Sequence, residues 1–392
     1  MATSMRPTKL DWGEETPTFN LEDYEGDLMV LNMGPQHPST HGVLRLELLT
    51  DGEVVREARP HIGYLHRNFE KHAENVDYPG VIPYVDRMDY VGSMANSLAY
   101  VLTVEKLMGI QVGERVKTIR VMVAELQRIA SHLLSVGTYG MDIGAYTPFL
   151  HCFRDREMVL DLFEWLCGAR LLYNFNWIGG VSHDLPEGWT DRARLFVDYF
   201  EPKIDVMDEL LSFNKIFTKR TASVGILPSD MAVAYAISGP NLRGSGIKWD
   251  IRKEEPYSGY ETYDFDVPIG KGRFGPIGSC WDRYYVRIQE MRESCRVIKQ
   301  AISKLPEGNV HEHVPKRVKP AKGEAYLRTE SPRGELAFYV ISDGGTIPFR
   351  VKGRSPCFVH MSVFHELARH EMIADMVAIV GSLDIVLGEI DR

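Results

Sequence analysis

The sequence has only five cysteines, and no two of them form a C-x-x-C pair. They are Cys152, Cys167, Cys280, Cys295 and Cys357. An odd number of widely spaced cysteines predicts neither a disulfide framework nor a self-contained iron–sulfur or zinc site. If the protein takes part in redox chemistry, its electrons must therefore arrive from elsewhere.

Long apolar runs and an excess of positive charge are also missing. No stretch approaches the roughly 18 to 20 continuous apolar residues that span a bilayer, and the first residues lack the apolar centre of a signal peptide. We therefore expect a protein that stays in the cytoplasm. Lys and Arg total 45 against 54 Asp and Glu, a net charge of −9, which argues against a nucleic-acid partner.

What is present is enough apolar sequence for a large core. Of the 392 residues, 44% are apolar and 25% are charged, which excludes a disordered or collagen-like chain. The length alone suggests two or three domains, and one continuous fold is the alternative. Residues 1–27 are polar, acidic and broken by Pro7 and Pro17, so we expect an extended arm there.

The hydrophobic periodicity predicts a mostly helical chain. Apolar residues tend to alternate between Leu28 and Val55 around the turn signal Asp51-Gly52, which predicts a small β-unit. Steps of three and four at Ile119, Met122, Leu126, Ile129 and Leu133 predict one face of a core helix. Helices are expected over 91–107, 114–135, 151–172, 280–304 and 364–380, a pair over 191–213, a strand over 334–340, an ordered loop over 238–278 and an exposed linker over 311–322.

Two histidine pairs could indicate metal binding. His37 and His41 stand four apart, but the flanking Gly and Pro residues place them on a turn, which leaves open a solvated role or a ligand or proton-transfer role. His365 and His370 stand five apart. On one continuous helix their directions differ by about 140°, so we expect ordinary helix surface rather than a zinc site.

Two further segments place acidic residues beside apolar sequence. Residues 86–90 (DRMDY) precede an apolar helix, where the charges could act only as caps, or Tyr90 could donate a hydrogen bond to a carbonyl. Asp142 lies in an apolar run after a core helix. A buried carboxylate needs a partner, and a histidine is a natural one.

From about Leu28 to Arg392 the chain resembles the quinone-site subunit of respiratory complex I, the D-type or 49-kDa-type subunit, which is related to the large subunit of nickel–iron hydrogenases. The resemblance rests on five strings: residues 34–42 (GPQHPSTHG), 63–67 (GYLHR), 86–90 (DRMDY), 238–246 (SGPNLRGSG) and 388–392 (GEIDR). It implies an α+β, predominantly α-helical, hydrogenase large-subunit-like fold. Residues 28–392 would form one domain, with a β-unit at about 28–60, a helical core at about 91–304, and a β-region and terminal helix at about 323–392.

The resemblance also implies roles for particular residues. His41 and Tyr90 would hydrogen-bond and protonate the quinone head, and Asp142 would partner His41. His37 and Thr138 would line the same pocket. Donors at both carbonyl oxygens suit a reaction that adds two electrons and two protons, and a His near pKa 6.5 and a Tyr near 10 each hold a proton near neutral pH under modest perturbation.

The resemblance places the electron source in a neighbour. Arg67 and Arg87 would lie near a terminal 4Fe-4S cluster carried by the B-type subunit of the complex. The C-type subunit and the H-type membrane subunit, which forms the quinone channel, would be further partners. The chain itself would bind no cofactor. It would lie, as a peripheral subunit, on the cytoplasmic side of the cell membrane in a proton-pumping NADH:quinone oxidoreductase.

Comparison with hydrogenases implies a lost metal site. Their two nickel-binding C-x-x-C pairs would match residues 89–92 (DYVG) and 386–389 (VLGE), where no thiolate remains. We therefore expect no metal centre in this chain. In residues 168–173 (GARLLY) a histidine that many members carry near the cluster is absent, and Leu172 and Tyr173 stand there instead.

Two other interpretations stay open. The chain could be a structural subunit that has lost quinone chemistry, which the joint presence of His41, Tyr90 and Asp142 disfavours. It could also belong to a related complex fed by ferredoxin rather than NADH. The sequence does not distinguish ubiquinone from menaquinone.

Overall fold

The structure is a computed structural model that describes residue 19, residues 28–37 and residues 41–392. The expected arm at residues 1–27 lies outside the described residues except for Phe19, and so do residues 38–40 of the turn between His37 and His41. Phe19 is buried, with the Arg59 guanidinium 3.9 Å from its ring centroid.

The predicted β-unit is a three-stranded antiparallel sheet. Its strands β1 (Met29–Met33), β2 (Arg45–Asp51) and β3 (Val54–His61) follow one another in order. Gly52 forms the β2–β3 hairpin with φ 59°, a conformation that glycine adopts without strain. Leu46 and Leu48 of β2 are fully buried, so the inward face of this sheet belongs to the main core.

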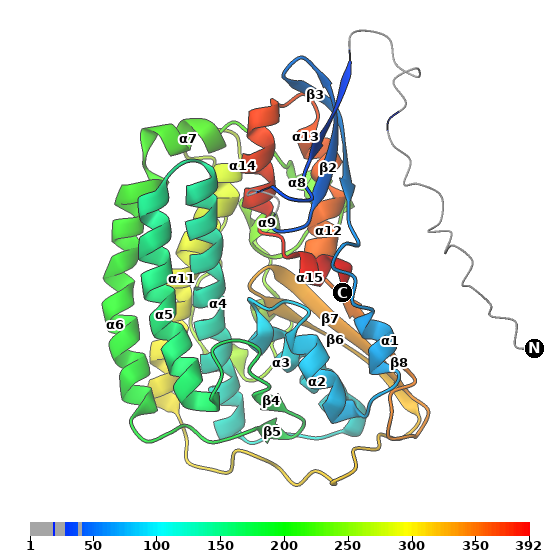
Figure 1. The fold of residues 1–392 in the computed structure, drawn as a ribbon. Helices are drawn as coiled ribbons and strands as arrows, with labels where there is room; N and C mark the ends of the chain where they lie inside the picture. Colours follow the sequence, from blue (N-terminus) through cyan, green and yellow to red (C-terminus); the bar gives the residue numbers. More distant parts are fainter. Residues whose placement is uncertain (1–18, 20–27, 38–40) are drawn as a thin grey trace, which may run out of the picture.

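A helical core fills one side of the molecule (Figure 1), where α4, α5, α6 and α11 lie side by side. These four helices are α4 (Glu114–Asp142), α5 (Tyr146–Cys167), α6 (Trp189–Met207) and α11 (Cys280–Lys304), and a fifth long helix, α3 (Ser93–Met108), lies outside this group. The five positions predicted to face the core from α4 are all fully buried. The helices expected at 91–107, 114–135, 151–172 and 280–304 are therefore present, with α4 extending seven residues further than predicted.

The core also holds charge. Glu125 of α4 accepts hydrogen bonds from Ser294 at 2.7 Å and Tyr260 at 2.7 Å, and Arg252 Nη1 lies 3.0 Å away. Burial alone would raise the pKa of Glu125, but Arg128 and Arg252 outweigh it and lower the pKa to about 2. Ion pairs buried in this way persist only where every charge has partners.

Two expected helices differ from the structure. The segment predicted as a pair over 191–213 is one helix, because α6 continues into a π-helical turn, η2 (Asp208–Ser212). The predicted helix over 364–380 is broken into α13 (Phe364–Ala368) and α14 (Ile373–Leu383). Between them, residues 369–372 leave the helical path to bond the edge of β3, where His370 N–H donates to Val55 O at 2.8 Å.

A second antiparallel sheet lies beside α3 (Figure 1). It consists of β6 (Gly323–Ser331), β7 (Gly334–Ser342) and β8 (Arg350–Arg354) in that order, so the strand expected at 334–340 is confirmed as β7. The remaining elements are α1 (Phe69–Ala73), α2 (Tyr78–Asp86), β4 (Asn176–Trp177), β5 (Gly180–Val181), α7 (Lys215–Thr221), α8 (Ser229–Ala234), α9 (Gly239–Gly244), α10 (Ile251–Glu254), η3 (Tyr260–Thr262), α12 (Pro356–Ser362) and α15 (Leu387–Asp391).

The architecture is thus α+β and mostly helical, as expected from the sequence. The region expected as a loop over 238–278 is largely irregular and contains only the short elements α9, α10 and η3. Among the described helices, none is both long and apolar enough to cross a membrane.

Candidate functional site

The C-terminal residues tie together three of the five strings. Asp391 accepts hydrogen bonds from the backbone N–H of Gly63 at 2.8 Å and of Leu65 at 2.7 Å. The Arg67 guanidinium donates to the carbonyl oxygens of Arg87 at 2.7 Å and Gly388 at 3.1 Å. Residues 63–67, 86–90 and 388–392 therefore meet around α15, although they lie far apart in the sequence.

The string 238–246 joins the same region through a close backbone contact. Gly239, with φ 64°, lies so near the β6–β7 turn that a Cβ atom there would come within 2.4 Å of Gly334 Cα. The Ser238 hydroxyl accepts a hydrogen bond from the backbone N–H of Glu335 at 3.0 Å. This packing holds the turn that carries Arg333 against the rest of the site.

Arg333 is the centre of a buried polar group that we call the Arg333 cluster: Arg333, Asp89, Asp384, Glu389 and Cys357. Its Nη1 donates to Asp89 Oδ2 at 2.6 Å, its Nε donates to the Asp384 carbonyl at 3.1 Å, and its Nη2 lies 3.6 Å from Asp384 Oδ1. Burial alone would lower the pKa of Arg333, but Asp384 and Asp89 outweigh it and raise that pKa. Arg333 therefore stays charged.

Two further members of the Arg333 cluster are neutral at pH 7. Burial raises the pKa of Glu389 to about 8, the negative charge of Asp89 adds to this rise, and Arg333 opposes it. Burial likewise raises the pKa of the Cys357 thiol, which lies on α12. The cluster thus combines a fixed cation with a carboxylic acid that keeps its proton near neutral pH.

Tyr90 lies between the Arg333 cluster and the surface. It follows Asp89 in the turn before α3 and is 36% exposed. A Cβ atom on Gly388 would come within 3.2 Å of Tyr90 Cε1 and 2.9 Å of Arg67 Nη2, so the absence of a side chain there lets α15 pack directly on the phenol. Partial burial raises the pKa of Tyr90, and the Asp89 charge raises it further. Tyr90 therefore carries its proton at neutral pH.

His41 approaches the Arg333 cluster from the loop between β1 and β2. Burial lowers its pKa, the Asp384 carboxylate opposes that effect and Arg333 adds to it. The ring is therefore neutral at pH 7, with one nitrogen as a donor and the other as an acceptor. Its buried Nε2 has no hydrogen-bond partner among the described residues.

The other predicted site residues occupy the following positions. His37 is half-buried after β1, and Asp142 is half-buried at the end of α4. The Thr138 hydroxyl donates within its own helix, to Leu134 O at 2.8 Å. Arg67 and Arg87 are exposed neighbours. The charged residues that shift the pKa of His41 are Asp384 and Arg333, and the predicted role of Asp142 stays a prediction.

Sequence reasoning missed Arg333 and Asp384. Arg333 occupies a two-residue hairpin turn, a place where arginine is usually solvated, and its burial results from packing against distant segments. Asp384 follows the last residue of α14 with φ 53°. Its position after an apolar helix does not indicate which residues surround it. The sequence did indicate Asp89 and Glu389, because they lie in the segments that would match the nickel-binding C-x-x-C pairs of hydrogenases.

His365 and His370 do not share one helix. His365 lies on α13 and its Nδ1 contacts Ser362 O at 2.9 Å, whereas His370 lies in the break before α14. The expectation of one continuous helix surface was therefore wrong. Across residue 19, residues 28–37 and residues 41–392, no three His, Cys, Asp or Glu side chains are arranged to hold a metal ion.

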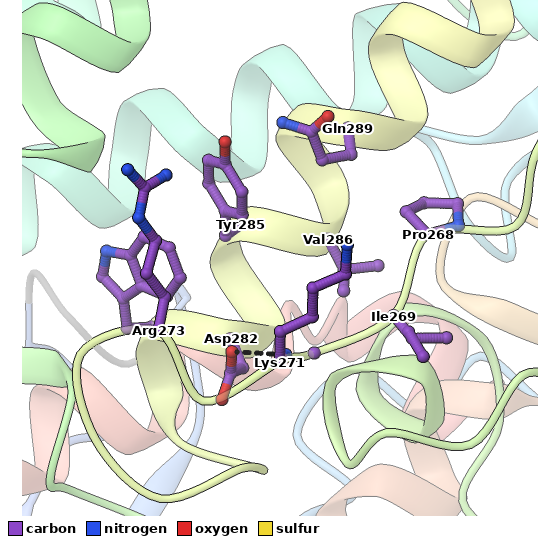
Figure 2. A pocket seen from close by; sticks show the side chains of 10 residues that line it. Pro268, Ile269, Lys271, Arg273, Asp282, Tyr285, Val286 and Gln289 are labelled. Atoms are coloured by element: carbon purple, nitrogen blue, oxygen red, sulfur yellow. Dashed lines mark hydrogen bonds between the residues drawn. The ribbon is translucent and has the colours of Figure 1, made fainter.

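A separate surface pocket of about 300 Å³ lies beside α11 (Figure 2). Trp281 and Tyr285 stack on one wall with ring centroids 4.6 Å apart, and the Lys271 backbone N–H donates to Asp282 across its floor at 3.3 Å. No residue predicted for the site lines this pocket. The Arg333 cluster, rather than this cavity, is therefore the candidate functional site.

The fold and the site define an α+β protein in which helix α15, the turn before α3, a neutral tyrosine and a neutral histidine lie around the buried arginine of the β6–β7 turn. The family model of the respiratory-chain NADH dehydrogenase 49 kDa subunit matches residues 142–322 and 311–392. The D-type subunit of NADH-quinone oxidoreductase from Chlorobaculum tepidum is 55% identical over 375 residues, which cover 95% of this chain and 94% of the relative.

Two further relatives carry the same name. The protein from Chlorobaculum parvum is 54% identical and that from Chlorobium phaeobacteroides is 56% identical, each over 95% of this chain and 94% of the relative. The chain therefore belongs to the 49 kDa subunit family of respiratory-chain NADH dehydrogenase.

Proposed function

We propose that this chain forms the quinone-reduction pocket of a proton-pumping NADH:quinone oxidoreductase and is active only within that complex. The observation that carries the proposal is the convergence of residues 63–67, 86–90, 238–246 and 388–392 on the Arg333 cluster, with Tyr90 and His41 at its edge. Its relatives' names include NADH-quinone oxidoreductase, which supports this choice of reaction.

The proposed chemistry follows from two neutral proton donors. Quinone reduction adds two electrons and two protons, and negative charge develops on the two carbonyl oxygens. Tyr90 donates to one oxygen and His41 to the other, while the fixed positive charge of Arg333 lies behind them and stabilises the developing charge. Asp142 partners His41, and His37 and Thr138 line the pocket around the head group.

The proposal assigns the electron source to a partner. Arg67 and Arg87 are exposed next to Tyr90, which suits two residues that face the 4Fe-4S cluster of the B-type partner across an interface. The C-type partner and the H-type membrane partner complete the surroundings, on the cytoplasmic side of the membrane. The chain itself contributes no cofactor.

Turnover by the purified complex tests this function. With NADH as donor, the complex should reduce a short-chain ubiquinone or a short-chain menaquinone, and the faster of the two identifies the physiological class. Reduced ferredoxin is the control donor, because it separates this function from that of a ferredoxin-fed relative. A complex whose iron–sulfur clusters are fully reduced by NADH, yet which reduces neither quinone, would contradict the proposal.

The segment around Leu172 leads to a separate expected result. Leu172 has a left-handed backbone, φ 60°, and no titratable ring stands at this position near the proposed cluster. The reduction potential of the terminal 4Fe-4S cluster should therefore vary less with pH than in family members that carry a histidine there. Redox titration of the complex at several pH values measures the slope. A Leu172→His variant should steepen it, and equal slopes in both proteins would contradict the expectation.

A further inference from the structure

Unpartnered polar atoms gather in the Arg333 cluster. Both carboxyl oxygens of Glu389, Nη2 of Arg333 and Oδ2 of Asp384 are buried and lack hydrogen-bond partners among the described residues, as does the nearby His41 Nε2. Buried polar atoms in folded proteins nearly always have a partner. These atoms could therefore complete their hydrogen bonds with bound water or substrate.

Glu389 is the one acid in this group whose two oxygens are both unpartnered. Three elements direct polar groups at it: the turn before α3 with Asp89, the β6–β7 turn with Arg333, and α12 with Cys357. Cys357 approaches through its thiol and backbone without completing a hydrogen bond of normal geometry. On its own helix, the preceding residue, Gly388, packs against Tyr90 and Arg67. Asp89, Arg333 and Cys357 act on both Glu389 and Tyr90, and Glu389 is fully buried whereas Tyr90 is partly exposed.

The charges around Glu389 suit a group that releases and regains a proton. Burial and Asp89 raise its pKa to about 8, so the acid form prevails at neutral pH. The neighbouring Arg333 charge limits the cost of forming the carboxylate. Cys357, the other neutral group, has a pKa raised too far for it to release a proton at this pH.

Resting on the proposed quinone reduction, we propose that Glu389 holds the proton that restores Tyr90 after the tyrosine has protonated the quinone. When the quinone takes up its two electrons, the Tyr90 O–H bond breaks and its proton forms an O–H bond on one quinone oxygen. The Glu389 O–H bond then breaks and, through a bound water, its proton re-forms the Tyr90 hydroxyl. The resulting carboxylate, held beside Arg333, takes a proton from solvent after the quinol leaves.

The substitution Glu389→Gln in the assembled complex tests this role. Glutamine matches the neutral acid in shape and charge but carries no acidic proton, so assembly and the KM for quinone should stay unchanged. We expect kcat to fall about 100-fold, within the range of a lost proton-transfer group. In the wild-type complex kcat should fall as pH rises through about 8, and in the variant this alkaline decline should disappear. Glu366→Gln, a half-exposed acid on α13, is the matched control and should leave both properties intact.

Infrared difference spectroscopy supplies a second measurement. In the wild-type complex, a carboxylic-acid C=O band should disappear on reduction of the quinone for as long as the quinol stays bound. The Glu389→Gln variant should show no such loss. Near-normal kcat with an unchanged alkaline limb in the variant would overturn the inference even if His41 and Tyr90 variants lose turnover. Normal turnover in those two variants would instead overturn the proposed function. If Glu389→Gln fails to assemble, a wild-type kcat that stays flat from pH 7 to about 9 would overturn it as well.

Discussion

Replacing Tyr90 by phenylalanine in the assembled complex is expected to lower quinone reduction about 100-fold, the loss typical of removing a proton donor from a reacting oxygen. The variant keeps the ring that packs against Gly388 and loses only the hydroxyl. Tyr90 is partly exposed, and its hydroxyl has no role in the hydrogen bonds that join the strings, so folding should not change. NADH-dependent reduction of the iron–sulfur clusters should remain normal, which isolates the defect to the quinone step.

The control for this experiment is Tyr84→Phe. Tyr84 has the same 36% exposure as Tyr90, but its ring stacks on His72 with centroids 5.4 Å apart, outside the Arg333 cluster. His41→Ala should reproduce the loss seen with Tyr90→Phe, because it removes the donor at the other quinone oxygen. Near-normal turnover in both variants, with the clusters still reducible, would favour the alternative of a purely structural role.

Local patterns account for the parts of the fold that were predicted. The three-and-four spacing along α4 and the Asp51-Gly52 turn each depend on residues close in sequence, and both are present. The break between α13 and α14 was missed because its cause is not local. Residues 369–372 leave the helix to hydrogen-bond an edge strand more than three hundred residues earlier, which no helical pattern reveals.

The residues of the site likewise fall into those that local sequence indicates and those that only the packing reveals. Tyr90 and His41 lie in strings that could be recognised one segment at a time, whereas Arg333 and Asp384 matter only through what packs around them. An arginine in a hairpin turn is expected to be solvated unless, as here, a distant glycine, Gly239, brings its turn into the core. The proposed partnership of His41 with Asp142 came from the resemblance, and the carboxylate that acts on this ring in the structure is Asp384.

Loss of the Arg333 charge should have the largest effect on stability. In Arg333→Met, Asp89 and Asp384 stay buried while the cation between them is gone. Removing one partner of a buried ion pair costs about 3–5 kcal/mol in unfolding free energy. Urea unfolding of the purified chain at pH 8 measures this loss. Arg350→Met is the control, since its ion pairs with Glu70 and Glu74 lie at the surface and are each expected to contribute less than about 1 kcal/mol.

The pH dependence of that loss identifies its cause. Burial already raises the pKa of Asp89 in the folded protein, and Arg333 is the main group that opposes this rise. A carboxyl whose folded-state pKa is raised destabilises the fold progressively as pH increases through that pKa. The deficit of Arg333→Met should therefore be smaller at pH 5 than at pH 8, and Asp89→Asn in the same chain should recover part of it. A deficit that is equal at both pH values and is not relieved by Asp89→Asn would mean that Arg333 acts through packing volume rather than through its charge.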